Sequence, residues 1–171
     1  GIWQAETLAV RSKDGRFVRA ETQFRDFVSA DGSTGFKAEA GRYHLYVSLA
    51  CPWAHRTLIF RVLKGLEDAI SISVVDPFMA DKGWAFGESE GCIADPLFGA
   101  RLMREIYTHA RAEYSGRVTV PVLWDRTRGA IVNNESAEII RMMNSEFVGI
   151  AKDSPDYCPD DLLSEIDEIN E

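Results

Sequence analysis

The sequence predicts an α/β fold built on a mixed four-stranded sheet, and three observations support this. A β-rich run at residues 43–49 leads through Cys51-Pro52 into helical spacing at 52–64, and strand-like alternation follows at 70–75. A second β-rich segment, 118–124, precedes a turn, a short strand and another helix. A right-handed β-α-β crossover makes the first two strands parallel, and the later hairpin adds antiparallel strands.

Residues 1–40 are predicted to form an amino-terminal arm. Asp14-Gly15 and the run from Asp31 to Gly35 are turn signals, which favour a short hairpin or coil. We expect the arm to pack on the body of the protein through its scattered aromatic side chains, which are Trp3, Phe17, Phe24, Phe27 and Phe36.

Residues 41–150 make up the predicted α/β domain. Its first helix, 52–64, ends at Gly65. The apolar side chains on or near one face of that helix are Trp53, Leu58, Ile59, Val62 and Leu63. Residues 76–99 hold many Gly and Pro breakers and are expected to be irregular, before helical spacing returns at 97–114.

The second half of this domain begins with the β-rich run 118–124. Residues 125–129 form a turn, and Ala130 to Val132 begin a further strand. Asn134 is a plausible N-cap for a helix that runs to about Asn144. This order of elements is that of a thioredoxin-like domain.

Residues 151–171 are predicted to be a linker and the first turns of an all-helical domain, because helical spacing resumes at Asp160. Eight of the 27 acidic residues and none of the 19 basic ones lie between Asp153 and Glu171, so the rest of the chain is neutral overall. We expect the acidic stretch to be a solvated helix start or linker. The charge pattern lacks the basic surface of a nucleic-acid binder.

Composition also bears on location and on metal chemistry. No run approaches the roughly 18 apolar residues that span a bilayer, and the first residues lack the layout of a secretory signal. We therefore expect a cytoplasmic protein without a membrane partner. The three cysteines are widely spaced and the three histidines scattered, so they predict neither a disulfide framework nor a metal site. For Cys92 and Cys158 we expect unreactive thiols.

Cys51 is the candidate nucleophile. It precedes Pro52, which suits the first helical position, and the unpaired N–H groups and dipole at a helix start stabilise a thiolate. Ala54 stands where a dithiol enzyme of this fold has a second cysteine. An external thiol, most simply glutathione, must then resolve any mixed disulfide. The competing interpretation is a buried structural cysteine.

Val120-Pro121 is the second candidate element. Pro121 removes a hydrogen-bond donor from a β-rich run, so it is expected at an edge or a bulge. In the thioredoxin-like fold the corresponding proline is cis, and the residue before it presents its backbone to a ligand peptide. We therefore expect Val120 to pair with the cysteinyl N–H and C=O of glutathione as an added strand.

Glu135-Ser136 lies at the start of the last helix of the domain. Free N–H groups and a serine hydroxyl make a carboxylate site, and Glu135 can hold an ammonium group. Together they match the zwitterionic γ-glutamyl end of glutathione. For the pair taken alone, simple N-terminal capping is the favoured explanation.

Four further side chains are weaker candidates. An exposed Trp84, in the irregular loop, would cover the ligand or plug an apolar gap. Arg117 would contact a glutathione carboxylate or be solvated. His55 and Arg56 would add positive potential near Cys51, although surface positions with a modest effect are the preferred interpretation.

Four blocks of sequence resemble the glutathionyl-hydroquinone reductases, the xi class of glutathione transferases; they are Arg42–Leu58, Lys82-Gly-Trp84, Arg117–Asp125 and Asn133–Ile140. The resemblance spans nearly the whole chain, including the arm and the long insertion before Pro121. An omega-class transferase shares the cysteine and the Glu-Ser pair but not the flanking blocks.

The resemblance implies the fold of a glutathione transferase N-terminal domain, and a reaction. The Cys51 thiolate attacks the sulfur of a glutathionyl-hydroquinone, hydroquinone leaves, and a second glutathione resolves the mixed disulfide. Glutathione is the co-substrate and no metal is implied. By motif position, the residues that would bind glutathione are Trp84, Arg117, Val118, Thr119, Val120, Pro121, Glu135 and Ser136.

Members of this family continue into an all-helical domain that holds the hydroquinone pocket. The resemblance therefore implies that this chain is an amino-terminal portion, that it exposes apolar surface meant for those helices, and that the whole protein is a homodimer. Two alternatives stay open. One is an omega-like thioltransferase or dehydroascorbate reductase, and the other is a non-catalytic glutathione-transferase-like module.

Overall fold

The structure is a computed structural model that describes residues 10–11, 17–18 and 22–170. The turn expected at Asp14-Gly15 and the side chains of Trp3 and Phe17 lie outside the described residues. In chain order the elements are β1 (Val10–Arg11), β2 (Phe17–Val18), β3 (Tyr43–Ser48), α1 (Pro52–Leu63), β4 (Ile70–Val75), α2 (Met103–Ala110), β5 (Val122–Asp125), β6 (Ala130–Asn133), α3 (Ser136–Ser145) and α4 (Leu163–Asn170).

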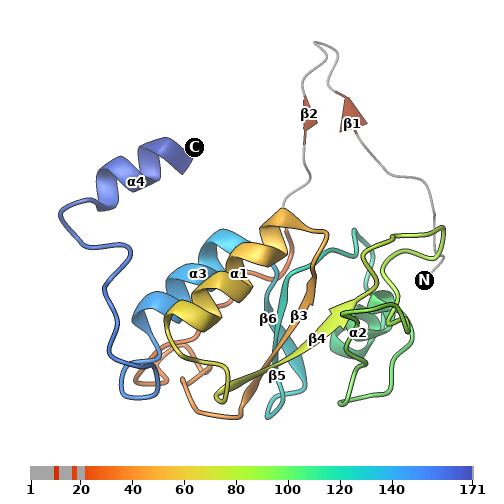
Figure 1. The fold of residues 1–171 in the computed structure, drawn as a ribbon, viewed down its shortest axis with the longest axis horizontal. Coiled ribbons are helices and arrows are strands. Elements are labelled where there is room, and N and C mark those ends of the chain that lie inside the picture. The colour runs from red at the N-terminus through yellow and green to blue at the C-terminus, as the bar shows by residue number, and fades with distance from the viewer. Residues whose placement is uncertain (1–9, 12–16, 19–21, 171) are drawn as a thin grey trace.

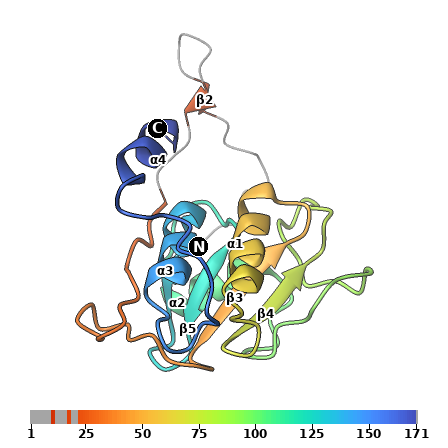
Figure 2. The same ribbon diagram turned by 60° about the vertical axis from the view of Figure 1, so that its left-hand side comes forward.

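A mixed four-stranded sheet forms the centre of the fold, with the strand order β4-β3-β5-β6. β3 runs parallel to β4 and antiparallel to β5, and β5 runs antiparallel to β6. α1 and α3 lie side by side on one face of this sheet, and α2 covers the other face (Figures 1 and 2). The predicted α/β layout and its mixed sheet are confirmed.

β3 is buried along its whole length because layers cover both faces of the sheet. Its one histidine, His44, lies between two serines of β4. Ser73 Oγ donates to the carbonyl of Ala94 at 2.9 Å, so it accepts the Nε2–H of His44, also at 2.9 Å. Ser71 Oγ then donates to Nδ1 at 2.7 Å. This pattern holds the ring neutral, and burial lowers the pKa of His44 to about 4.

A buried carboxylate shortens the helix that was expected at 97–114. α2 begins only at Met103 and ends at Ala110, so the predicted bounds are wrong. Asp95 binds the hydroxyl of Tyr46 and the backbone of its own loop, accepting from the N–H groups of Leu97, Phe98 and Ala100. Those N–H groups are thereby held in a loop that helical periodicity does not foresee.

α1 buries a different face from the one that its apolar residues suggest. Its buried residues are the small Ala54 and Thr57, which let the helix lie close to the sheet and to α3. Most of the apolar residues expected on one face lie outside, with exposed fractions between 43% and 58%; these are Trp53, Ile59, Val62 and Leu63. The outer surface of α1 is therefore strongly apolar.

Residues 22–40 of the arm pack on the body of the protein, as expected, whereas β1 and β2 project away from it (Figure 1). Asp26 N–H donates to the carbonyl of Val132 at 3.0 Å, and an antiparallel bridge pairs Arg25 with Asn133. The arm thus covers the free edge of β6. β1 and β2 pair antiparallel, which confirms a short hairpin. Of the aromatic side chains of the arm that the structure describes, Phe24 and Phe36 are buried and Phe27 is largely exposed.

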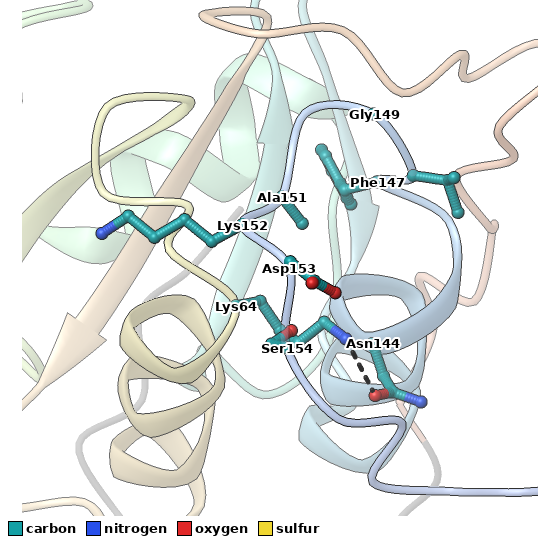
Figure 3. A pocket seen from close by; sticks show the side chains of 9 residues that line it. Lys64, Asn144, Phe147, Gly149, Ala151, Lys152, Asp153 and Ser154 are labelled. Atoms are coloured by element: carbon teal, nitrogen blue, oxygen red, sulfur yellow. Dashed lines mark hydrogen bonds between the residues drawn. The ribbon is translucent and has the colours of Figure 1, made fainter.

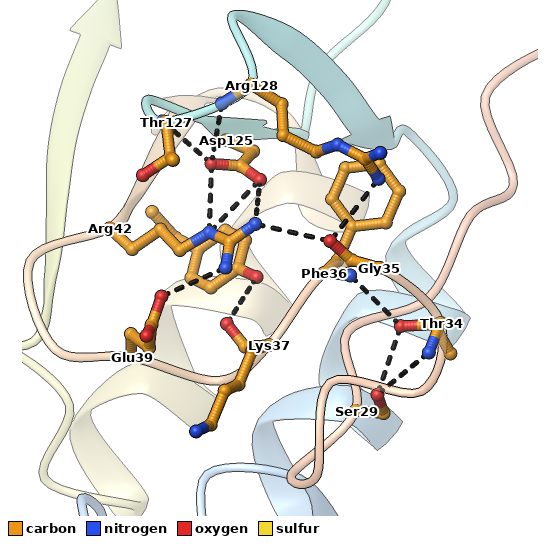
Figure 4. Close-up of polar contacts among 11 residues, drawn as sticks. Ser29, Thr34, Gly35, Phe36, Lys37, Glu39, Arg42, Asp125, Thr127 and Arg128 are labelled. Carbon is orange, nitrogen blue, oxygen red and sulfur yellow. Dashed lines mark hydrogen bonds and ion pairs between the residues drawn. The ribbon is translucent and has the colours of Figure 1, made fainter.

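A second buried carboxylate, Asp125, joins the arm to the sheet at the end of β5 (Figure 4). Arg42 donates to it through Nη2 at 2.6 Å and through Nε at 3.1 Å. Asp125 also accepts the N–H of Thr127 at 2.8 Å, which turns the chain toward β6. The guanidinium of Arg42 reaches on to Glu39 at 2.9 Å and to the carbonyl of Gly35 at 3.4 Å. The Asp125 carboxylate raises the pKa of Arg42, so Arg42 stays charged.

Replacing Asp125 by alanine tests how much this ion pair contributes to stability. Asp125→Ala leaves a nearly buried guanidinium without its main partner, and we expect the free energy of unfolding to fall by about 3–5 kcal/mol. Urea denaturation with an unchanged m-value measures it. Glu39→Gln is the control, because Glu39 is 51% exposed and should change stability by less than about 0.5 kcal/mol. Equal effects of the two substitutions would contradict this account.

His44 predicts a pH dependence of stability. The unfolded chain takes up a proton on this imidazole below about pH 6.5, whereas the folded chain does so only near pH 4. The unfolded state therefore binds more protons in this window, and the free energy of unfolding falls as the pH drops from 6.5 to 4, by at most about 3 kcal/mol. The measurement is urea denaturation across this range. His44→Gln should have a shallower slope; an unchanged slope would show that His44 does not supply it.

Candidate functional site

Cys51 lies at the start of α1, where the sequence predicts it. It is the N-cap residue, with extended backbone angles (φ −97°, ψ 112°), and Pro52 takes the first helical position. Its carbonyl accepts the N–H of His55 at 2.9 Å. The residue is half-buried, and Sγ lies 3.7 Å from the carbonyl oxygen of Val120. Because it is only partly buried, Cys51 differs from an enclosed structural cysteine.

The peptide bond between Val120 and Pro121 is cis, as the predicted fold requires. β5 begins at Val122, so the strand is shorter than the expected run 118–124. Within the described part of the chain, neither the N–H nor the C=O of Val120 makes a backbone hydrogen bond. Both groups can therefore pair with an extended ligand, and the Cys51 thiol lies beside them.

A buried hydroxyl holds the segment before this proline in place. The Tyr107 hydroxyl donates to the carbonyl of Thr119 at 3.0 Å and accepts the N–H of the same residue at 3.2 Å. It also accepts Nδ2–H of Asn134 at 3.1 Å, and Oδ1 of Asn134 accepts the N–H of Phe24 at 3.3 Å. One chain of hydrogen bonds thus links the arm, the turn between β6 and α3, and the loop before Pro121. Val118 and Thr119 in that loop are half-buried.

The turn between β6 and α3 carries the predicted Glu-Ser pair. Glu135, and not Asn134, is the N-cap residue of α3, since its Oε1 accepts the N–H of Ala137 at 3.4 Å. The N-cap prediction for Asn134 is wrong because its amide is turned inward to Tyr107. The side chain of Asn133 accepts the N–H of Glu135 at 2.7 Å and so fixes the turn. Capping therefore accounts for part of what Glu135 does.

Sequence reasoning named Arg56 as a weak candidate but missed its contact with Ser136. It was expected to be a surface side chain of modest effect, but its guanidinium crosses from α1 to α3. Nη2 and Nε donate to Ser136 Oγ at 2.7 and 3.0 Å, and Nη2 lies 3.8 Å from Glu135 Oε1. The neighbouring His55 is exposed, as expected. One feature of the sequence could have predicted this contact. Arg56 is a basic residue in the first turns of α1, and this fold places α1 beside α3.

Trp84 and Arg117 lie apart from these contacts. Trp84 is half-buried against the core, which agrees with the second of its two expected roles, an apolar plug, and its carbonyl accepts the N–H of Met103 at 2.9 Å. Arg117 has an exposed side chain, and its carbonyl accepts the hydroxyl of Tyr114 at 2.6 Å. In the region that the structure describes, neither residue bonds to Cys51 or to the Glu-Ser pair.

A hollow of about 340 Å³ lies at the carboxyl-terminal ends of α1 and α3 (Figure 3), whereas Cys51 is at the amino-terminal start of α1. The buried Lys64 lines it and donates through Nζ to the carbonyl of Pro155 at 3.2 Å and to Oδ1 of Asn144 at 3.5 Å. The last carbonyls of two helices make this end of the fold negative, and the Lys64 ammonium offsets that charge. The hollow is therefore not the predicted glutathione site.

Among the described residues, no group of three or more His, Cys, Asp and Glu side chains is placed to hold a metal ion. Within the same ranges, no helix combines the length and the apolar character needed to cross a bilayer. The three cysteines are free, and each is half-buried.

Comparison with known proteins gives a consistent result. The family described as "Glutathione S-transferase, N-terminal domain" matches residues 50–146. Glutathionyl-hydroquinone reductase YqjG of Escherichia coli is 50% identical over 99% of this chain, and glutathionyl-hydroquinone reductase PcpF of Sphingobium chlorophenolicum is 46% identical over 99%. The glutathione-bound structure of YqjG superposes with a TM-score of 0.83 at 55% identity, covering 86% of this chain and 50% of that chain.

These matches confirm the resemblance to the glutathionyl-hydroquinone reductases that the sequence blocks indicate. The chain spans about half the length of the curated relatives, 54% of the Escherichia coli protein and 53% of the Sphingobium protein.

The hydroxyl of Tyr107 can be removed without changing the shape of the core. Tyr107→Phe leaves the amide of Asn134 and the backbone of Thr119 without a partner in a fully buried place. We expect a loss of about 1–3 kcal/mol of unfolding free energy, measured by urea denaturation. Tyr157→Phe is the matched control, because Tyr157 is 36% exposed, and it should cost less than about 0.5 kcal/mol. If both variants unfold at the same urea concentration, the hydroxyl has no such role.

Proposed function

The chain belongs to the family of glutathione S-transferase N-terminal domains, and we propose that it is the glutathione-binding, thiol-bearing part of a glutathionyl-hydroquinone reductase. Cys51 is the nucleophile, glutathione the co-substrate and a glutathionyl-hydroquinone the substrate. The observation that carries the proposal is the place of Cys51 Sγ, at the start of α1 and 3.7 Å from the Val120 carbonyl, with Ala54 in place of a second thiol.

The surroundings of Cys51 favour a negative sulfur. As the N-cap residue it lies at the first N–H groups of α1, and the first turn of this helix holds no acidic residue. These N–H groups at the helix start support Cys51 as the nucleophile.

Glutathione would lie across the site as an added strand. Its cysteinyl backbone pairs with Val120, which places its sulfur at Cys51, and its γ-glutamyl end meets the Glu-Ser pair at the start of α3. Glu135 takes the ammonium and Ser136 the carboxylate. The exposed side chain of Arg117 is available to the other carboxylate.

The remaining predicted residues act around this core of the site. Tyr107 holds the backbone of Thr119, so Val118 and Thr119 serve to place Val120 and Pro121 more than to touch the ligand. Trp84, in the loop after β4, would contact glutathione from outside this core. These roles are part of the proposal.

The reaction then takes two steps. The Cys51 thiolate attacks the sulfur of the glutathionyl-hydroquinone; a sulfur–sulfur bond forms, the sulfur–carbon bond breaks, and the ring carbon takes a proton to give hydroquinone. A second glutathione thiolate attacks the glutathione sulfur of the mixed disulfide, releasing oxidised glutathione and the Cys51 thiolate. Over both steps, the sulfur of the substrate's glutathionyl group and the sulfur of the second glutathione each lose one electron, and the ring carbon gains both.

The whole reaction is assigned to the complete protein. The curated relatives are about twice as long as this chain. The cytoplasmic setting and the homodimer stay predictions.

Cys51→Ser in the full-length protein tests the nucleophile. With glutathione and a glutathionyl-hydroquinone, we expect the rate to fall by more than about 100-fold, because the hydroxyl is a far weaker nucleophile. Mass spectrometry of the wild type should find glutathione on Cys51, and the adduct should be absent from the variant. Cys92→Ser is the control and should keep the rate within about twofold. Retained turnover in Cys51→Ser would refute the proposal.

Two comparisons separate the alternatives. An omega-like enzyme would reduce dehydroascorbate faster than the glutathionyl-hydroquinone. In a non-catalytic module, Cys51 would react with iodoacetamide like an ordinary thiol, slowly below about pH 7, whereas an activated cysteine stays reactive there.

A further inference from the structure

Ser136 is nearly fully buried, with an exposed fraction of 3%, and it receives two hydrogen bonds from one guanidinium. We propose that Arg56 is a positioning residue that fixes the Ser136 hydroxyl as a donor toward the carboxylate at the γ-glutamyl end of glutathione. The inference rests on the proposed function and deepens it, since it names the residue that makes this end of the site selective for an anion.

The hydrogen-bonding capacity of Ser136 decides what its hydroxyl can do. A serine hydroxyl has one proton and two lone pairs. Arg56 Nη2 and Nε lie 2.7 and 3.0 Å from Ser136 Oγ and use the lone-pair side of that oxygen. The hydroxyl can then only donate. Its acceptor within the protein, Glu135 Oε1, lies at 3.5 Å, which is long for such a bond. A ligand carboxylate oxygen is a much better acceptor for this proton.

The guanidinium is itself held in place. Arg56 lies over the ring of Trp53, with 5.0 Å between the guanidinium carbon and the ring centre. The Arg56 side chain is 26% exposed, so its charge is only partly screened by water. α1 and α3 lie side by side (Figure 1), which brings the two side chains together across the helix pair. The fork of an arginine suits this role, because a lysine cannot direct two rigid N–H groups to one oxygen.

Charge around the pair matches both ends of a zwitterion. The Arg56 guanidinium and the first N–H groups of α3 favour a carboxylate near Ser136. Glu135 lies beside them, with Oε1 3.8 Å from Nη2 of Arg56. A ligand that brings an ammonium group to Glu135 and a carboxylate to Ser136 satisfies each of these groups, as the γ-glutamyl end of glutathione does.

The test combines two variants with two ligands in the full-length protein. Arg56→Met keeps an apolar stem on Trp53 but removes the charge and the donors, and Arg56→Lys keeps the charge without the fork. The ligands are glutathione and its analogue in which the α-carboxylate of the γ-glutamyl residue is a carboxamide. Isothermal titration gives each Kd, steady-state kinetics gives KM and kcat, and near-ultraviolet circular dichroism checks the fold.

We expect Arg56→Met to raise the Kd of glutathione by about tenfold or more, and that of the carboxamide by less than about threefold. Arg56→Lys should fall between wild type and Arg56→Met for glutathione. Because Arg56 bonds to Ser136, the loss in Arg56→Met should appear mainly as a higher Kd and KM for glutathione. Arg126→Met removes one exposed charge from the turn beyond Asp125, at the other end of the sheet from Cys51, and should leave both Kd values unchanged.

Equal losses for both ligands, or no loss for glutathione, would overturn the role of Arg56 while leaving the proposed function intact. If the wild type binds neither ligand, the proposed function fails together with this inference. If Arg56→Met does not fold, the ratio of the two Kd values in Arg56→Lys decides, since a ratio equal to that of the wild type contradicts the proposal.

Discussion

The hydroxyl of Tyr107 is the interaction on which the candidate site depends. It lies in a fully buried position and binds Thr119 on one side and Asn134 on the other. The first contact sets the loop that ends in the cis peptide bond, and the second sets the turn before α3. An unpaired polar group in the interior is costly, so this network holds the two loops in one relative position. The arm takes part through Phe24, whose N–H reaches the same asparagine.

The strand order explains why the two helix starts meet. β3 is antiparallel to β5 and β5 to β6, so β3 and β6 run in the same direction. α1 follows β3 and α3 follows β6, so both helices begin at the end of the sheet where β3 and β6 finish (Figure 1). Their N–H groups place positive potential where Cys51 and Ser136 lie. The last carbonyl groups of both helices lie at the opposite end of the sheet, and the ammonium group of the buried Lys64 balances their negative potential there (Figure 3).

Local patterns predicted what depends on neighbours in the chain, and missed what depends on distant partners. Strand alternation and helical spacing located the main elements, and Cys51-Pro52 marked the start of α1. The same reasoning made the helix that contains Tyr107 too long, because the start of that helix depends on the buried carboxylate of Asp95. It also assigned the N-cap of α3 to Asn134, whose side chain is used by a tyrosine 27 positions away. Neither the start of α2 nor the N-cap of α3 can be predicted from the residues next to it in the sequence.

By itself the sequence determined the α/β order, the cysteine at a helix start without a second thiol, and the proline after Val120, since each is a property of adjacent residues. Only the tertiary structure decided that Arg56 turns to Ser136 and that Trp84 packs against the core. It likewise decided that α1 hides alanine and threonine while its larger apolar residues face outward. Side-chain direction depends on which surfaces meet, and these surfaces come from elements far apart in the chain.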